Sequence, residues 1–333
     1  MKEVLGLDVG TSRLVAARKA AQGTEFESQL NAFVSIPHNK MTESALAKEG
    51  VPFTVDNGQI MVHGNESARF ADLLQMETRR PMTKGVLNAD EPESSAHLGH
   101  LIRTLLGDRK PTRVTFTVPA APLGNQESLT YHEATVTQIL TGMGHRPTAI
   151  NEGLAVIYAE MESSNYSGIG ISCGGGLVNV SLAYLSVPVL SFSLPKAGDF
   201  IDSSTASITG ELATRVRLAK EDSFYLNGST GSKMQHVLTV YYDDMIKSIV
   251  TGLREAFSAT RNIPKFSKAI PLVLAGGSAL PRGYRDRFEK ALRETDFPLS
   301  LSEVRVAESP LNTTAKGALV AALADGEAAA ATA

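Results

Sequence analysis

The stretch VLGLDVGTSRLVAA, residues 4–17, contains two short apolar runs separated by a turn that includes Gly10. The runs read as the two strands of a hairpin. Glycine at the tip lets backbone N–H groups approach a ligand closely, because no side chain intervenes. The hydroxyls of Thr11 and Ser12 add donors, and Asp8 supplies a carboxylate that can hold Mg2+ through water. The stretch predicts a phosphate-binding hairpin, although an ordinary tight hairpin would share this pattern.

A second segment, IGISCGGGLVNVSLAY at residues 169–184, repeats this design about half a chain later. Its tip is Gly174-Gly175-Gly176, between a strand that begins at Ile169 and a return from Val178 to Tyr184. Two hairpins of one design suggest a duplicated domain. Facing each other, the two tips could grip a polyphosphate from opposite sides.

Strand-like and helix-like segments alternate along the rest of the chain, which favours an α/β fold. Residues 114–118 (VTFTV) and 272–275 (LVLA) have the composition of short strands, and each is predicted to form one. Helices are expected over residues 126–142 and 242–262, and the latter places apolar side chains on one helical face.

Composition narrows the class of protein. The 333 residues are 43% hydrophobic and 20% charged, which is typical of globular domains. A net charge of −3 argues against direct binding of nucleic acid. The one cysteine fits a reducing compartment. No apolar run approaches the roughly 20 residues needed to span a bilayer, and no signal peptide is evident. We expect a cytoplasmic protein without membrane insertion.

A series of motifs along the chain resembles those of the actin, MreB and heat-shock chaperone ATPase superfamily. Each motif is weak alone, but together they cover nearly the whole chain in the order of the family. They are the first phosphate loop at residues 5–12, the first connecting helix at 150–155, the second phosphate loop at 171–176, the adenosine motif LAGGSALPRG at 274–283, and the second connecting helix at 314–318.

Further segments are similar to those of the bacterial actins MreB and MamK: RPMTKGV at 80–86, KAGDFID at 196–202 and RLAKE at 217–221. The resemblance implies an actin-like ATPase fold, in which two duplicated ribonuclease-H-like domains surround a nucleotide cleft. The implied domains are residues 1–150, with a small insert at about 31–78 and a returning last helix at 311–324, and residues 151–308, with a small insert at about 200–240. Residues 325–333 are expected to be a flexible tail.

The resemblance also implies roles for particular residues. Asp8 would order Mg2+ and its waters, and Glu152 would position the water that attacks the nucleotide. The phosphates of ATP or ADP would be held by one set of residues and the adenosine by another. The phosphate set is Gly10, Thr11, Ser12, Gly174, Gly175 and Gly176, and the adenosine set is Lys220, Glu221, Gly276, Gly277 and Leu280.

The chain departs from the family pattern in the second hairpin and in the connecting helix. Ser172 and Asn179 stand where relatives usually carry acidic residues, and Leu177 stands where threonine is common. Gly153 replaces a proline that often follows the catalytic acid. Because the glycine backbone is retained, ATP binding is less threatened than ATP hydrolysis, which we expect to be slow.

The function implied by the resemblance is nucleotide-dependent polymerisation into cytoskeletal filaments, with an unidentified adaptor or cargo protein as a further partner. The alternative is a nucleotide-binding assembly adaptor of the FtsA or PilM type, which would not polymerise. A sugar kinase or exopolyphosphatase is disfavoured, because no acidic substrate-site motif lies between the two implied domains.

Three other residues are given structural roles. His97 and His100 stand three apart on an expected helix without further ligands nearby, so a solvated or capping role is favoured over a metal site. Cys173 lies at the expected lip of the phosphate cleft and reads as a small packing residue, although nearby amides could lower its pKa.

Overall fold

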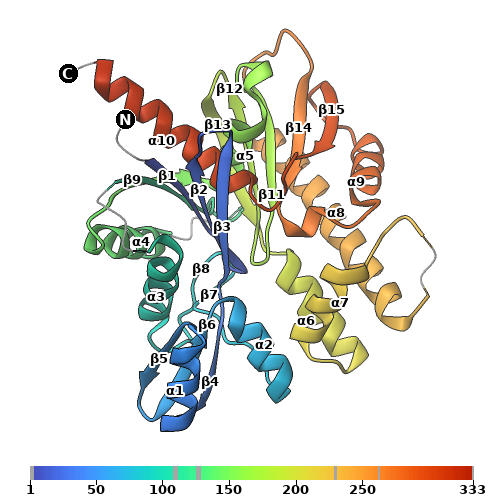
Figure 1. The fold of residues 1–333 in the computed structure, drawn as a ribbon. Coiled ribbons are helices and arrows are strands. Elements are labelled where there is room, and N and C mark those ends of the chain that lie inside the picture. Colours follow the sequence, from blue (N-terminus) through green and yellow to red (C-terminus); the bar gives the residue numbers. More distant parts are fainter. Residues whose placement is uncertain (1–3, 108–111, 125–128, 229–230, 262, 332–333) are drawn as a thin grey trace.

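The structure, a computed structural model, describes residues 4–107, 112–124, 129–228, 231–261 and 263–331. Two five-stranded sheets form its centre, and helices lie between and around them (Figure 1). Two smaller units extend to the same side of the molecule (Figure 1): a three-stranded sheet with helices α1 and α2, and a helical lobe that contains α6 and α7. This mixed architecture confirms the predicted α/β fold class.

The first sheet has the strand order β10-β9-β1-β2-β3. Strands β1, β2 and β3 run antiparallel to one another, whereas β9 and β10 continue the sheet in parallel from β1. Their bounds are β1 Val4–Val9, β2 Arg13–Lys19, β3 Thr24–Leu30, β9 Arg113–Val118 and β10 Arg146–Asn151.

The second sheet, β13-β12-β11-β14-β15, repeats this arrangement strand for strand. Strands β11, β12 and β13 are antiparallel, and β14 and β15 extend the sheet in parallel from β11. The matching topology confirms the duplication that the two glycine-tipped hairpins predicted. The bounds are β11 Gly168–Cys173, β12 Val178–Tyr184, β13 Val187–Leu194, β14 Ile270–Ala275 and β15 Leu301–Val306.

Two helices lie between the sheets. Helix α5 (Glu152–Glu160) packs on β11 and β12 of the second sheet, and α10 (Thr313–Ala331) packs on β1, β2 and β9 of the first. The two helices also pack against each other. Other helices pack on the outer faces of the sheets: α3 (Ser94–Leu106) and α4 (Thr130–Gly142) on the first sheet, and α8 (Lys233–Ala259) and α9 (Tyr284–Arg293) on the second.

Several predicted helix bounds need correction. Helix α10 begins at Thr313 and continues past residue 324 to Ala331, so its bounds differ from the expected 311–324, while the expected flexibility of residues 325–333 stays a prediction. The physical reason for the longer helix is composition, since alanine has the highest intrinsic helix propensity. Helix α8 begins at Lys233, well before the expected residue 242, because Ser232 caps it by accepting a hydrogen bond from the Gln235 N–H at 3.2 Å. Residues 125–128 of the expected helix 126–142 lie outside the described residues.

The small insert contains β4 (Phe33–Pro37), α1 (Lys40–Lys48), β5 (Phe53–Asp56), β6 (Gln59–His63) and α2 (Asn65–Leu74), and the chain returns through β7 (Met82–Thr83) and β8 (Val86–Leu87). Its sheet buries a separate apolar cluster that includes Val34, Leu46 and Ile60. Because these side chains pack against one another, the insert has a small core of its own.

The histidines on α3 are not solvated or capping residues. His97 is buried and stacks on Phe33, with ring centroids 4.1 Å apart, and His100 lies 4.4 Å from the buried ring of His63. Burial lowers the pKa of His97 and of His100 from the ordinary value. The described residues contain no group of three or more side chains placed to hold a metal ion. The histidines therefore serve as neutral packing between α3 and the insert.

The helical lobe of the second half contains α6 (Gly198–Thr209) and α7 (Ala213–Ser223). Helix α6 follows β13 after a short connection and packs against both α7 and α8. None of the helices described by the structure combines the length and the apolar character that a membrane span needs.

Candidate functional site

A cavity of about 430 Å³ lies where the tips of the two hairpins meet. This volume is within the usual range of small-molecule sites. Both tips, the first turn of α5, the helices α6 and α7, and the end of β14 contribute to its wall. Every site residue expected from the sequence lines the cavity: Asp8, Gly10, Thr11, Ser12, Glu152, Gly174, Gly175, Gly176, Lys220, Glu221, Gly276, Gly277 and Leu280.

The first tip is closed by a hydrogen bond from the Gly10 N–H to the Arg13 carbonyl at 3.1 Å. A Cβ atom at Gly10 would lie 2.8 Å from that carbonyl oxygen, so glycine is required for the turn. The Thr11 hydroxyl oxygen accepts a hydrogen bond from the Gly85 N–H at 2.9 Å. This contact anchors the first tip to the segment that returns from the insert.

The second tip touches the first directly. A Cβ at Gly175 would lie 2.9 Å from the Cβ of Ser12, and one at Gly176 would lie 2.4 Å from the Oγ1 of Thr11. Side chains at these two positions would push the tips apart, which explains the glycines in physical terms.

In the second tip, protein donors occupy the carbonyl groups of Gly174 and Gly175, and the Gly174 N–H donates to the Leu177 carbonyl at 3.1 Å. The Gly174 carbonyl accepts from the Gly198 N–H and the Ser278 hydroxyl, and the Gly175 carbonyl accepts from the Asp199 N–H at 2.8 Å. Among the described residues, the N–H groups of Gly175 and Gly176 have no protein acceptor. Adjacent open amides in a glycine turn form a concave donor site that suits an anion.

Two buried carboxyl groups lie beside the tips. Asp8 at the end of β1 accepts a hydrogen bond from the Thr117 hydroxyl at 2.6 Å, and Glu152 at the start of α5 accepts one from the Ser172 hydroxyl at 3.2 Å. Burial raises the pKa of Asp8, and burial together with the charge of Asp8 raises the pKa of Glu152 to about 8. Two carboxyl groups with raised pKa values form a site that a cation would stabilise.

Two of the departures from the family pattern, Asn179 and Gly153, have local explanations. Asn179 is fully buried, and its Oδ1 accepts from the Ala120 N–H at 2.8 Å, so this position supports the backbone. Its side chain also interacts with the carboxyl group of Glu152, which partly offsets the effect of burial by lowering the pKa of Glu152. Gly153 donates its N–H to the capping Oδ1 of Asn151 at 2.9 Å, which a proline could not do. A Cβ at Gly153 would also lie 2.7 Å from the Ser181 nitrogen.

The opposite end of the cavity is formed by α7 and the β14 loop. The ammonium group of Lys220 is paired with the carboxylate of Asp202 at 2.7 Å, and both side chains are buried. Glu221 pairs with Arg13 of the first half of the chain at 3.4 Å. The backbone of Gly276 has φ +88° and passes so close to Cys173 that a Cβ would lie 2.3 Å from its carbonyl oxygen.

Several further residues that had no expected site role also line this cavity. They include Arg13, Asp199, Asp202, Arg217, Phe224, Tyr242, Ser278, Arg282 and Thr314. Arg217 and Asp202 belong to the segments 217–221 and 196–202, which resemble bacterial actins, so the resemblance could have indicated that they lie at the site. Tyr242 lies on the buried stripe of α8, and its position at the cavity could not be distinguished from an ordinary core position.

Cys173 does not lie at the lip of the cavity. Its side chain is fully buried, and its sulfur lies 3.5 Å from the hydroxyl of Tyr284. Burial raises the pKa of the Cys173 thiol to about 12, opposite to the lowering that nearby amides could have produced. The thiol is therefore an unreactive packing group.

The raised pKa of Glu152 makes stability depend on pH. Folded protein holds this proton more tightly than unfolded protein, so the stabilisation is complete below the unfolded pKa near 4.5 and is lost as pH rises through about 8. We expect the free energy of unfolding of the ligand-free protein, measured by urea denaturation, to fall between about pH 5 and pH 8. Glu152→Gln should flatten this fall. Glu133→Gln on the exposed face of α4 is the control, and an equal slope in Glu152→Gln would contradict the assignment.

Comparisons with known proteins agree with this geometry. The family model described as Volactin matches residues 3–322. No curated protein shows a significant match. The structure of a MamK double helical filament superposes with a TM-score of 0.71 at 19% identity, covering 97% of this chain and 99% of that one. MreB 5 of Spiroplasma citri bound to AMPPNP gives 0.70 at 14% identity, covering 100% and 99%.

The ethanolamine utilization protein EutJ from Carboxydothermus hydrogenoformans is a third, more distant similarity, with a TM-score of 0.55 at 14% identity over 96% of this chain and 89% of that one. At such identities the similarities establish the fold alone. The fold is that of the bacterial actin-like ATPases, which confirms the resemblance inferred from the motifs.

Proposed function

The chain belongs to the Volactin family, and from this membership and the geometry of the cleft we propose that it binds ATP with Mg2+, hydrolyses it slowly and polymerises into cytoskeletal filaments. The observation that carries the nucleotide proposal is the pair of touching glycine tips, with the open amides of Gly175 and Gly176 beside two buried carboxyl groups. Relatives of this fold are described with AMPPNP or ADP bound, which supports the same ligand class here.

In the proposed complex, the amides of Gly175 and Gly176 and the hydroxyl of Ser12 hold the β- and γ-phosphates, while Gly10 and Gly174 keep the tips close enough to do so. Thr11 keeps its oxygen on Gly85 and has its proton left to donate. The adenosine lies between α7 and the β14 loop, against Gly277, Leu280 and Glu221. Lys220 lies at the adenosine end of the cavity as the ion-pair partner of Asp202 and does not act as a free cation.

The donor set near the tips fits Mg2+. Asp8 offers a buried carboxylate held by Thr117, and Mg2+ commonly completes its octahedral shell with waters and substrate phosphates. When bound, the ion would neutralise phosphate charge. Glu152 lies next to Asp8 at the start of α5, where it can orient a water toward the terminal phosphate.

We further propose that the two sheets belong to two rigid bodies, residues 1–150 with 311–324 and residues 151–308, which close on the nucleotide. Their mutual contact runs through α5 and α10. Bound nucleotide would then set the angle between the bodies, and with it the match between the two ends of successive subunits in a filament.

Hydrolysis should be slow, because Ser172 supplies a hydroxyl where a carboxylate would help to order Mg2+ and water. Glu152→Ala should lower steady-state phosphate release at least about tenfold, which corresponds to about 1.4 kcal/mol of transition-state stabilisation. Ser172→Asp should raise phosphate release, and Ser172→Ala is its control. Wild-type turnover equal to that of an actin-like ATPase with the acidic residue would show that Ser172 is not limiting.

The polymerisation proposal is tested by light scattering and electron microscopy across a protein concentration series with ATP, ADP or no nucleotide. We expect assembly above a critical concentration with ATP, because a heterologous contact that does not close produces a filament. The expected upper surface lies on the insert and the α6–α7 lobe, where Leu73 and Ile208 are exposed. Leu73→Asp and Ile208→Asp should raise the critical concentration, whereas Tyr131→Asp on α4 should not. A monomer under all three conditions would favour the adaptor function.

A further inference from the structure

Asp199 is an unexpected neighbour for a phosphate. It lies in the first turn of α6, and its N–H donates to the Gly175 carbonyl at 2.8 Å. A Cβ at Gly175 would lie 3.4 and 3.6 Å from the two carboxylate oxygens of Asp199. The carboxylate therefore lines the cavity beside the second glycine tip. An uncompensated negative charge at this point would repel the phosphates that the tip is proposed to bind.

The other carboxyl groups that line the cavity are compensated at the site itself. Asp202 is paired with Lys220, and Glu221 is paired with Arg13. Asp8 and Glu152 lie at the proposed Mg2+ position, where the ion would supply the compensating charge. All the residues in these arrangements are themselves part of the cavity lining.

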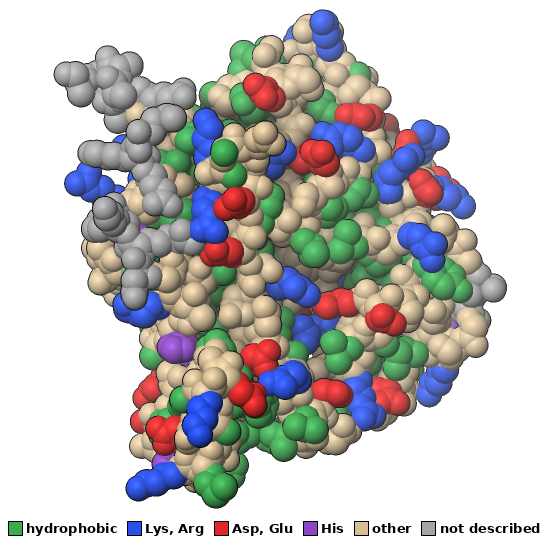
Figure 2. Space-filling model, in the orientation of Figure 1, with side chains coloured by type: hydrophobic (Ala, Val, Ile, Leu, Met, Phe, Trp, Pro, Cys, Tyr) green, Lys and Arg blue, Asp and Glu red, His purple; other side chains and the backbone are tan. Residues whose placement is uncertain are grey.

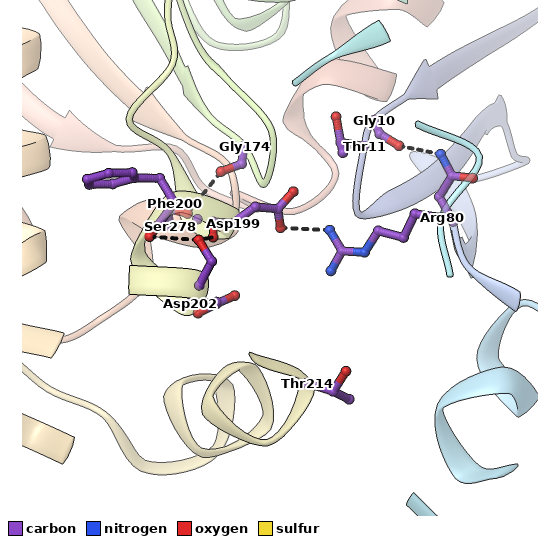
Figure 3. A network of polar contacts seen from close by, with 12 residues as sticks. Gly10, Thr11, Arg80, Gly174, Asp199, Phe200, Asp202, Thr214 and Ser278 are labelled. Carbon is purple, nitrogen blue, oxygen red and sulfur yellow. Dashed lines mark hydrogen bonds and ion pairs between the residues drawn. The ribbon is translucent and has the colours of Figure 1, made fainter. Parts of the chain in front are cut away.

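Asp199 is compensated by a residue outside the lining. The guanidinium nitrogen Nη1 of Arg80 lies 2.6 Å from Oδ1 of Asp199, and the side chain of Arg80 is 19% exposed. Arg80 belongs to the segment that returns from the insert, so the pair joins the two halves of the chain across the cleft. Figure 3 shows the two side chains pointing toward one another, with Gly10 and Thr11 of the first tip on the side of Arg80 and Gly174 on the side of Asp199.

The segment that carries Arg80 is held in place by further contacts across the cleft. The Thr214 N–H donates to the carboxylate of Glu77 at 3.3 Å, and the guanidinium of Arg215 donates to the side-chain carbonyl of Gln75 at 2.5 Å. Acidic and basic side chains gather along this groove between the insert and the α6–α7 lobe (Figure 2). These contacts hold Arg80 against Asp199 without lining the cavity themselves.

We infer that Arg80 is a positioning residue for the triphosphate: by neutralising Asp199 from the opposite half of the chain, it sets how strongly the cleft prefers ATP over ADP. The inference rests on the proposed nucleotide site. The terminal phosphate of ATP adds negative charge close to Asp199. Neutralising Asp199 therefore changes the free energy of binding of ATP more than the free energy of binding of ADP. A structural tie between the two halves would instead change the affinity for both nucleotides by the same factor.

The test is a double-mutant cycle with Arg80→Gln, Asp199→Asn and the double variant, in which the dissociation constants of MgATP and MgADP are measured by calorimetry. Arg80→Gln leaves Asp199 uncompensated and should weaken MgATP about tenfold and MgADP about threefold or less. Asp199→Asn leaves Arg80 uncompensated and should raise the preference for MgATP. The double variant should return the ratio of the two constants to near the wild-type ratio.

Arg69→Gln is the matched control, because it removes the same charge from the insert at an exposed position, where Arg69 pairs with Glu66 at 2.6 Å. Its ratio of dissociation constants should equal that of the wild type. An unchanged ratio in Arg80→Gln, with both nucleotides still bound, would overturn the inference and leave the nucleotide site intact. Weaker binding of both nucleotides in Asp199→Asn would also overturn it, by placing Asp199 among the Mg2+-ordering groups. Failure of the wild-type protein to bind either nucleotide would overturn the proposed function itself.

Discussion

Replacing Gly277 with valine should weaken nucleotide binding at least about hundredfold while leaving the protein folded. Gly277 lines the cavity at the start of a short 3-10 helix, and a Cβ there would meet only the end of the Leu311 side chain, at 3.4 Å. Leu311 is 41% exposed and can move aside, so the backbone tolerates a side chain. The two methyl groups of valine would instead fill space proposed for the adenosine, where close packing makes even one methylene costly.

We expect calorimetry to show at least about hundredfold weaker MgATP binding, or about 2.7 kcal/mol, with a nearly unchanged thermal midpoint. Gly277→Ala should have an intermediate effect on affinity. Gly276→Ala provides the contrasting control, since its positive φ and its contact with the Cys173 carbonyl predict a loss of stability instead. Full-affinity binding by Gly277→Val would show that the adenosine does not lie against this loop.

Replacing Gly317 with alanine should strongly destabilise the whole protein. Gly317 lies in α10 where this helix crosses α5, and a Cβ there would lie 1.8 Å from the Ala155 carbonyl oxygen. The obstacle is backbone and not a flexible side chain, so the helices would have to separate. Because α10 packs on the first sheet and α5 on the second, their separation would also disturb the contact between the two halves.

Overpacking of this kind costs about 1–3 kcal/mol, occasionally more, and a clash with backbone belongs to the upper end. Urea denaturation measures the loss. Gly142→Ala at the end of α4 is the matched control, since nothing lies within 4 Å of its Cβ position, and it should leave stability unchanged or slightly higher. Equal stability of Gly317→Ala and the wild type would contradict the close crossing of α5 and α10.

The sequence by itself determined the features that depend on neighbouring residues. The glycine tips, Asp8 and the Gly276-Gly277 turn could be recognised because a strand, a tight turn and a returning strand leave a local pattern of apolar and glycine residues. The duplication followed from the repeat of that pattern, and the order of the motifs led to the fold. The cavity residues expected from these motifs lie together in the structure.

Only the tertiary structure decided which distant side chains meet. Arg80 and Asp199 are 119 residues apart, and Arg13 and Glu221 are 208 apart, so no local pattern relates them. Burial could not be predicted from local patterns either. Cys173 was expected at the lip of the phosphate cleft and His97 in a solvated or capping position, yet both are buried. The physical reason is that the charge and burial of a side chain depend on the packing of the two halves against each other, which is a sum of many contacts between residues far apart in the chain. Backbone turns, in contrast, follow from the steric limits of a few adjacent residues.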